Sequence, residues 1–322
     1  MRGVNWLWMG TTGTLLPRRR PTELVAGRGE CRAEALHNRR KGFMPLELPD
    51  GKRLAVNIGV DFDAQCAFNG HMPTLSPSIL SRGEFDVEVG APRLLALFDR
   101  FGIPTTWCTP GHTLITFPDS IRAVLDGGHE IAAHGAYHES VPSLSEDEER
   151  RLMELQLGQH EKIVGRRPRG YRSPAWDFSN ATLGILEEFG FEWDSSLMGR
   201  DFEPYRPRPV VAHREEPNEF GPPSSVLELP VSWFMDDFPA LDHVPGMLAG
   251  LMATDGVFSR WRDTFDYAYD EVPGGVVILT VHGIVSGRAH TIKLLQRYIE
   301  HVKQHGDVWF ATLSEIYDCW SD

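Results

Sequence analysis

The chain has 322 residues, of which 41% are hydrophobic and 24% are charged, and its formal net charge is −13. These values are typical of a soluble globular protein, and no run approaches the roughly 18 consecutive apolar residues that a membrane span requires. The acidic balance argues against nucleic acid or an anionic membrane surface as a partner, and it suits a small neutral or cationic substrate.

Residues 1–43 differ from the remainder of the chain. They contain nine Lys or Arg against three Glu, and they show no sustained hydrophobic periodicity. We expect either a disordered N-terminal extension or a start codon assigned too early, with Met44 as the natural start. Residues 44–322 are then expected to form one folded domain.

The four cysteines (Cys31, Cys66, Cys108 and Cys319) show neither CxxC nor zinc-ribbon spacing. Cys66 and Cys108 lie in or beside apolar segments, where free thiols serve as small hydrophobic groups. We therefore expect reduced cysteines and a cytoplasmic protein.

From residue 54 onward, short apolar runs alternate with helical patterns. The apolar runs predict strands at 54–61, 104–109, 130–134, 170–174, 226–230, 276–282 and 308–313. The periodicity predicts helices at 91–102, 118–128, 145–165, 179–190 and 287–305, with a short last helix. Ser145 followed by Glu148 is a capping-box signature for the third of these helices. Residues 204–224 are rich in Pro and Gly and are expected to form an inserted loop.

This alternation indicates a parallel sheet that is either doubly wound or closed into a barrel. In both arrangements, functional groups gather at the carboxyl ends of the strands. Six polar residues fall at or just beyond predicted strand ends: Asp61, Asp63, His134, His138, Arg172 and His282.

These residue types are typical of a metal-dependent hydrolase, which needs three protein ligands and one open position. His134 and His138 can reach one ion, and Asp61 or Asp63 can complete the ligand set while the other serves as general base. The metal would polarise a carbonyl and lower the pKa of its water.

Further roles follow for the two remaining residues. Arg172 would hold the general base ionised. His282 would act as general acid toward a leaving nitrogen. Each residue alone has an ordinary structural explanation, and the case rests on the whole set lying at strand ends.

Other residues have two readings each. Trp176 and Trp233 could wall a substrate pocket or belong to the core. Arg82 and Glu88 could cover the site or lie in a solvated loop. Either Asp236 or Asp237 could tune His282, and the sequence does not choose between them.

Four stretches of the chain, in the order VDFD, AHGAYH, GYRSPAW and LTVHG, resemble the motifs of the polysaccharide deacetylase (NodB-homology) superfamily, carbohydrate esterase family four. The resemblance covers residues 45–320 and implies a distorted (β/α) barrel of about seven parallel strands. It implies Asp61 as catalytic base, and Asp63, His134 and His138 as metal ligands. It also implies that Arg172 orients the base, and that Leu279 and His282 form the last motif, with His282 as the acid.

Two departures from the family's pattern stand out. Gly135 replaces the Ser or Thr that usually follows the first metal histidine, and Gly283 and Ile284 replace a Pro often followed by Asp. Several stretches are most similar to a branch that contains peptidoglycan-deacetylase-like proteins, allantoinase-like proteins and cyclic imide hydrolases. Members of that branch tend to be intracellular and oligomeric, so we expect a homo-oligomer.

The leading hypothesis is a hydrolase of a non-peptide C–N bond that binds one divalent metal ion, with Zn²⁺ expected first and Co²⁺, Mn²⁺ or Fe²⁺ also compatible with His₂Asp ligation. Its substrate would be a small or cyclic amide. The alternative is an N-acetylated amino sugar, as in peptidoglycan or chitin. A non-haem Fe(II) oxygenase shares the ligand set, but the α/β pattern disfavours it. A non-catalytic binder is disfavoured because Asp61 and His282 are both present.

Overall fold

The computed structural model describes residues 45–68, 75–244 and 250–320. The chain divides into two units, Met1–Phe43 and Met44–Asp322, and every described residue belongs to the second. The expectation of a disordered extension over residues 1–43 therefore lies outside the described residues.

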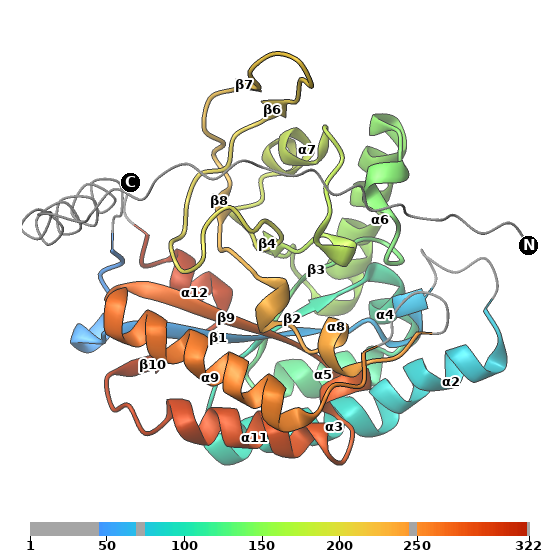
Figure 1. Ribbon diagram of the computed structural model, residues 1–322. Coiled ribbons are helices and arrows are strands. Elements are labelled where there is room, and N and C mark those ends of the chain that lie inside the picture. The colour runs from blue at the N-terminus through green and yellow to red at the C-terminus, as the bar shows by residue number, and fades with distance from the viewer. Residues whose placement is uncertain (1–44, 69–74, 245–249, 321–322) are drawn as a thin grey trace, which may run out of the picture. The chain divides into compact units, whose positions relative to one another are not determined.

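The second unit is built on a sheet of eight strands whose neighbours all run parallel (Figure 1). The strands are β1 Leu54–Asp61, β2 Thr106–Thr109, β3 Glu130–Ala133, β4 Gly170–Tyr171, β5 Trp193–Asp194, β8 Leu227–Glu228, β9 Gly275–His282 and β10 Val308–Phe310. From β1 the order continues through β2, β3, β4 and β5 to β8, while β9 pairs with the other edge of β1. This confirms the predicted distorted (β/α) barrel.

Strands β1 and β9 form the centre of the barrel. Every residue of both strands is buried, as their mainly apolar sequences predict for parallel strands covered on both faces. The segment after β8 pairs with β9 at one position, a single parallel β-bridge between Asp236 and Thr280. This bridge brings the segment after β8 next to the end of β9.

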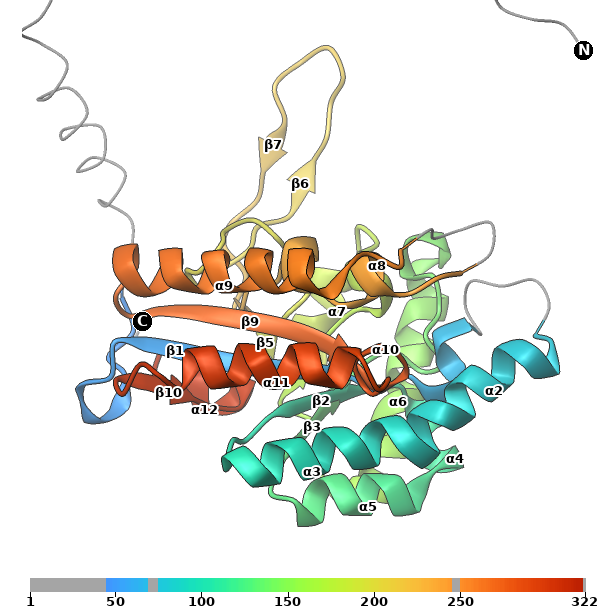
Figure 2. The same ribbon diagram turned by 60° about the horizontal axis from the view of Figure 1, so that its bottom comes forward.

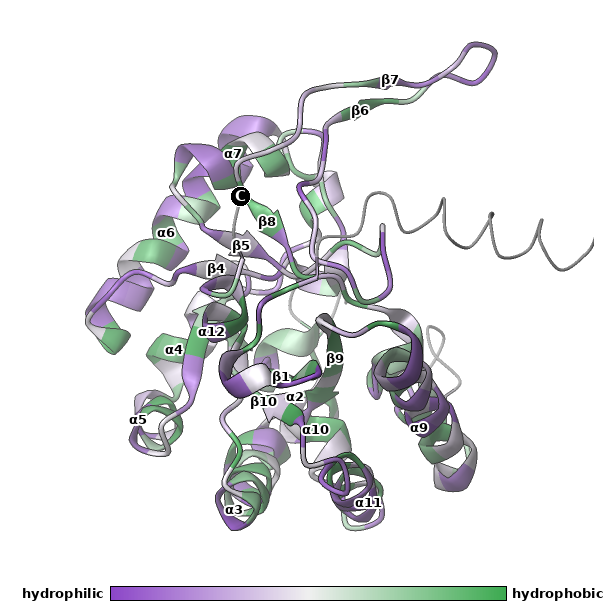
Figure 3. Cartoon of the chain, turned by 90° about the vertical axis from the view of Figure 1, so that its left-hand side faces the viewer, coloured by the Kyte–Doolittle hydropathy of each residue, from purple (hydrophilic) through white to green (hydrophobic). Residues whose placement is uncertain are grey.

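Helices cover the outside of the sheet. They are α2 Pro77–Phe85, α3 Ala91–Phe101, α4 Gly111–Thr116, α5 Pro118–Asp126, α6 Glu146–Val164, α7 Thr182–Glu188, α8 Phe238–Leu241, α9 Thr254–Glu271, α10 Gly283–Ser286, α11 Thr291–Val302 and α12 Leu313–Tyr317. Figure 3 shows α5, α3, α11 and α9 in an arc around β1 and β9. In α3 the buried residues Leu94, Leu97 and Phe98 form the apolar stripe of an amphipathic helix, which ends at Gly102 with φ +60°.

The predicted strands and helices are present with ends shifted by a few residues, and three local features differ. Ser145 caps α6 as predicted, but Glu148 pairs with Arg151 instead of completing a capping box. The 204–224 segment contains a two-stranded hairpin, β6 Val210–Val211 and β7 Glu219–Phe220, which projects from the body (Figure 2). The long helix α9 was not predicted, and neither was α2, which places Arg82 on a helix instead of in a loop.

Cys66 and Cys108 are reduced thiols and fully buried, which confirms their prediction as small hydrophobic groups. Among the described residues, no helix has the length and apolar character needed to cross a membrane.

Candidate active site

The polar residues predicted at strand ends meet at one edge of the barrel. Asp61 ends β1 and is paired in register with His282, the last residue of β9. The other members come from the turns that follow β1, β3 and β4. All of them are buried: Asp61, Asp63, His134, His138, Arg172 and His282.

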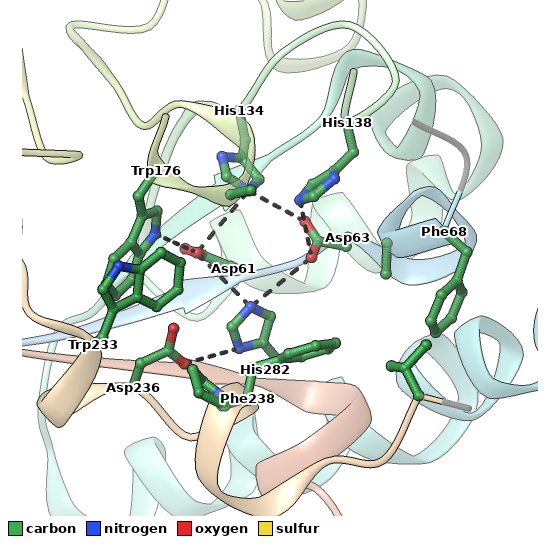
Figure 4. A pocket seen from close by; sticks show the side chains of 14 residues that line it. Asp61, Asp63, Phe68, His134, His138, Trp176, Trp233, Asp236, Phe238 and His282 are labelled. Carbon is green, nitrogen blue, oxygen red and sulfur yellow. Dashed lines mark hydrogen bonds and ion pairs between the residues drawn. The ribbon is translucent and has the colours of Figure 1, made fainter. Parts of the chain in front are cut away.

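Asp63, His134 and His138 form a candidate metal group, because one ligand atom from each lies within 4.8 Å of the others. Nε2 of His134 is 3.4 Å from Oδ1 of Asp63, and Nε2 of His138 is 3.8 Å from Oδ2 (Figure 4). Ligands about 2.1 Å from a tetrahedral Zn²⁺ are about 3.4 Å apart, so these spacings fit a shared ion. Nδ1 of His134 lies 2.7 Å from the Arg172 carbonyl oxygen, and donation there leaves Nε2 free for a cation.

The loop that carries the two histidines explains the glycine at position 135. Gly135 has φ +73°, and a Cβ there would lie 2.7 Å from Cγ of Pro174 and 3.0 Å from each carboxylate oxygen of Glu139. Those oxygens accept hydrogen bonds from the backbone N–H groups of Ala136 (3.0 Å) and Tyr137 (2.8 Å). A buried carboxylate therefore fixes the loop between His134 and His138, in space that a side chain at 135 would occupy.

Asp61 is held as an ionised carboxylate. Arg172, itself fully buried, donates from Nη1 to Oδ1 at 2.7 Å, and Trp176 donates from Nε1 to Oδ2 at 3.4 Å. Burial alone would raise the pKa of Asp61, but the charges of Arg172, His134 and His282 outweigh it and lower this pKa to about 2. Arg172 is oriented by Ser195, which accepts from Nε at its carbonyl oxygen and from Nη2 at Oγ, both at 2.9 Å.

His282 is paired with Asp237, which the sequence could not separate from Asp236. Nδ1 of His282 is 2.8 Å from Oδ1 of Asp237, whose carboxylate also accepts from the His282 N–H and from the Ser286 hydroxyl. Burial would lower the pKa of His282, but the hydrogen bond and charge of Asp237 raise it well above its usual value. Nε2 points to the other side, 3.9 Å from Oδ2 of Asp61.

A second acidic group surrounds the same imidazole. Asp236, Asp237 and His282 also have ligand atoms within 4.8 Å of one another. Nδ1 of His282 is already engaged with Asp237, so the candidate metal group on the Nε2 side is the better cation site. Burial raises the pKa of Asp236 to about 8, and the neighbouring Asp237 adds to this effect.

The glycine after His282 also has a structural reason. A Cβ on Gly283 would lie 2.0 Å from Oδ1 of Asp86, a buried residue of the π-helical segment Asp86–Gly90 that joins α2 to α3. Oδ2 of Asp86 accepts from the backbone N–H of Ala64, next to Asp63, at 3.1 Å. Burial, reinforced by the Asp63 carboxylate, raises the pKa of Asp86 to about 8. Asp86 thus occupies the space between the turn of the metal carboxylate and the turn of His282.

We expect Gly283→Ala to lower the free energy of unfolding by about 1–3 kcal/mol, because the added methyl group would overlap the buried carboxyl group of Asp86 and force it to shift. In an Asp86→Ala background the same change should cost clearly less, since that methyl then fills vacated space. Urea unfolding of the two single variants and the double variant measures this. If the losses of stability of the two single variants simply add up in the double variant, the proposed overlap is contradicted.

The site opens into a cavity of about 280 Å³. Its polar wall consists of Asp61, Asp63, His134, His138, Asp236 and His282, and its apolar wall of Ala67, Phe68, Ala175, Trp176, Trp233, Phe238, Pro239 and Val244. Trp176 and Trp233 both line it, with stacked rings 4.3 Å apart between centroids and 23° between planes (Figure 4). These two aromatic residues thus form part of the cavity wall, as one of the two sequence-based alternatives expected.

Arg82 and Glu88 lie outside the lining of this cavity. Arg82 forms an ion pair with Asp242 and donates to the His243 carbonyl oxygen, so its guanidinium ties α2 to the segment before Val244. It also stacks on the outer side of Phe68, at 5.0 Å from the ring centroid. Glu88 is exposed on the π-helical segment between α2 and α3. Three residues that support the site were not predicted from the sequence: Asp86, Glu139 and Ser195, which accept hydrogen bonds from Ala64, from the loop after His134 and from Arg172.

A (β/α) barrel with a buried His₂Asp group, an arginine-held carboxylate and a His–Asp pair at its strand ends has the layout of a hydrolase. The sequence profile described as polysaccharide deacetylase matches residues 84–193. The peptidoglycan deacetylase of Helicobacter pylori is 33% identical over 282 residues, which cover 83% of this chain and 96% of that protein. The peptidoglycan deacetylase-like protein FGM2 of Gibberella zeae is 31% identical over 87% of this chain and 90% of its own length. The chain belongs to the polysaccharide deacetylase family.

Solved structures show the same fold. A polysaccharide deacetylase homologue from Mycobacterium smegmatis has a TM-score of 0.75 and 34% sequence identity, over 85% of this chain and 92% of that chain. PuuE allantoinase has a TM-score of 0.73 at 24% identity, over 87% of this chain and 95% of that chain. The second likeness concerns the fold alone.

Proposed function

We propose that this protein is a divalent-metal-dependent hydrolase of the amide C–N bond of a small or cyclic substrate. The observation that carries the proposal is that the candidate metal group, Asp61 and His282 all line one cavity of about 280 Å³. Family membership supports hydrolysis of an amide as the reaction class.

Asp63, His134 and His138 are the residues that would hold the cation. One buried carboxylate and two imidazoles fit Zn²⁺, and Co²⁺, Mn²⁺ and Fe²⁺ accept the same donors. When bound, the cation would polarise the amide carbonyl and lower the pKa of a water molecule.

The remaining residues divide the proton transfers between them. Asp61, kept ionised by Arg172, takes a proton from the attacking water. His282, kept cationic by Asp237, gives its Nε2 proton to the leaving nitrogen. Since Nε2 of His282 lies 3.9 Å from Oδ2 of Asp61, base and acid face the same reacting group.

The dimensions and walls of the cavity favour a compact substrate. Its volume of about 280 Å³ lies just below the usual range for small-molecule sites, roughly 300–1,000 Å³. The flat faces of Trp176 and Trp233 suit a planar ring. The second candidate is removal of an N-acetyl group from an amino sugar, and it is favoured by the names of the two relatives, which are peptidoglycan deacetylases or similar to them.

An assay of the purified, Zn²⁺-supplemented protein on a cyclic imide and on an acetylated chitooligosaccharide separates the candidates. We expect ring opening of the imide, measured as loss of its ultraviolet absorbance. Release of acetate from the oligosaccharide alone would support the second candidate. Hydrolysis of neither, with metal bound, would contradict the proposed function.

A further inference from the structure

Ala64, the residue directly after Asp63 of the candidate metal group, has a strained backbone. Its φ is +51°, in the left-handed region that a residue with a Cβ rarely adopts. Alanine has no polar side chain that could stabilise this conformation locally. Strained residues persist only where the surrounding structure holds them, so a contact from elsewhere in the chain must hold Ala64.

Asp86 supplies that contact. Its Oδ2 accepts a hydrogen bond from the Ala64 N–H at 3.1 Å, and the side chain is only 1% exposed. Asp86 begins the π-helical segment Asp86–Gly90, and such segments are frequent at functional sites. Helix α2, just before it, packs on the same turn, since a Cβ on Gly83 would lie 2.6 Å from the Ala64 carbonyl carbon. The carboxyl group is thus fixed against the Ala64 N–H.

The peptide unit that joins Asp63 to Ala64 is held at both of its polar groups. The Asp63 carbonyl oxygen accepts from the Thr113 hydroxyl at 2.7 Å and from the Cys66 N–H at 2.9 Å. The N–H of the same peptide unit is the one that Asp86 binds. A rotation of this unit would relieve the positive φ of Ala64, but it would also change the backbone of Asp63 and redirect its carboxylate.

The hydrogen bond from Ala64 does not require a charge on Asp86. Burial, reinforced by the Asp63 carboxylate, raises the pKa of Asp86 to about 8, so near pH 7 its neutral form prevails. The carbonyl oxygen of a neutral carboxyl group accepts a hydrogen bond, and so does the amide oxygen of Asn. Asn at position 86 should therefore serve the same purpose.

We propose that Asp86 is a positioning residue for the candidate metal group. Its hydrogen bond to Ala64 holds the strained turn after Asp63, so that the Asp63 carboxylate stays directed toward the two metal histidines. A site that is arranged before the cation arrives binds it more tightly, because no binding energy is spent on selecting the competent conformation. The inference rests on the proposed function and adds a residue that sets its metal affinity.

Calorimetric titration of the metal-free parent and variants with Zn²⁺ tests this role. We expect Asp86→Ala to bind Zn²⁺ about 10–100-fold more weakly, the range for loss of a residue that orients a metal ligand. Asp86→Asn should stay within about threefold of the parent, because its amide oxygen still accepts from Ala64. Circular dichroism shows whether each variant is folded, and Asp86→Leu, which nearly keeps the side-chain volume, replaces Asp86→Ala if the latter does not fold.

The Ala64→Gly change separates positioning from a general loss of stability. In the Asp86→Ala background it should restore the Zn²⁺ affinity by at least about threefold, because glycine adopts a positive φ without steric cost. In the parent, where Asp86 already holds the turn, it should change the affinity by less than about twofold. The matched control is Glu149→Ala, which removes a buried carboxylate that binds Ser179 and Thr182 outside the cavity lining. It should destabilise the fold and leave the Zn²⁺ affinity unchanged.

Three results would overturn the role of Asp86: parental Zn²⁺ affinity in Asp86→Ala, equal weakening in Asp86→Ala and Asp86→Asn, or no recovery on adding Ala64→Gly. Equal weakening would assign the effect to charge. The expected affinities without hydrolysis of any amide would support the positioning role and contradict the proposed function. Hydrolysis of an amide with parental Zn²⁺ affinity in Asp86→Ala would overturn the positioning role alone, and no Zn²⁺ binding by the parent would overturn both.

Discussion

Replacing Asp61 with Asn is expected to lower kcat/KM for the amide substrate by about 10³-fold, within the range for loss of a general base. Asn has nearly the same shape and still accepts the Arg172 hydrogen bond, but it cannot take up a proton. The pKa of Asp61 is about 2, so the parent base is ionised at every pH above about 3. Steady-state rates near pH 7 on the parent and the variant measure the effect.

Stability and metal binding must be followed in the same variant. Breaking a buried ion pair costs up to about 3–5 kcal/mol, so the assay temperature has to lie below the Tm of Asp61→Asn. Glu149→Gln is the matched control, because Glu149 is a buried carboxylate outside the cavity that accepts from Thr182 and Ser179. A folded, metal-loaded Asp61→Asn variant within tenfold of parental activity would remove Asp61 as the base.

Replacing Asp237 with Asn is expected to move the alkaline limb of the kcat/KM–pH profile to lower pH and to reduce activity at pH 8 by about 10²-fold. The hydrogen bond and charge of Asp237 raise the pKa of His282, so the protonated acid persists above the usual range of histidine. Activity that needs this proton is present below that pKa and is lost as the pH rises through it. Without the Asp237 charge the loss begins closer to pH 6.5.

Ser286→Ala provides a graded comparison for that prediction. The Ser286 hydroxyl donates to Oδ2 of Asp237, away from the imidazole, so its removal should shift the limb much less than Asp237→Asn does. An alkaline limb at the same pH in the parent and in Asp237→Asn would show that His282 is not held cationic by Asp237.

The sequence was most informative where local pattern and topology coincide. Long apolar runs predicted β1 and β9, and the parallel arrangement then required their last residues to meet at one edge. Residues that follow other strands at that edge, such as His134 and Arg172, could therefore be grouped before any distances were available. The capping signal at Ser145 and the stop at Gly102 were readable because they are local interactions.

The predictions failed or stayed open where the deciding contact is distant in sequence. Arg82 pairs with Asp242, which is 160 residues away in the sequence. This ion pair holds the Arg82 side chain outside the cavity lining. Asp236 and Asp237 are neighbours, and their roles are separated by side-chain contacts: Oδ1 of Asp237 lies 2.8 Å from Nδ1 of His282, whereas Oδ1 of Asp236 lies 3.7 Å from it. The glycines at 135 and 283 were visible as departures, but their partners Glu139 and Asp86 depend on side-chain space.

Helix α9 shows a different limit. Its buried residues Val257, Trp261, Phe265 and Ala268 follow a helical period, so the signal was present in the sequence. The residue before it, Ala253, makes no side-chain cap, and polar residues separate the apolar positions. Without a capping residue to mark its start, the spacing of these four apolar residues did not by itself indicate a helix.

We infer that Asp63, His134 and His138 bind one divalent metal ion. Measuring the metal content by elemental analysis tests this inference most directly. We expect about one equivalent of metal per chain in the purified parent, less than a tenth of that in an Asp63→Ala, His134→Ala double variant, and an unchanged content in Asp237→Asn. No metal in the parent after supplementation with Zn²⁺, Co²⁺, Mn²⁺ or Fe²⁺, or full metal content in the double variant, would contradict it.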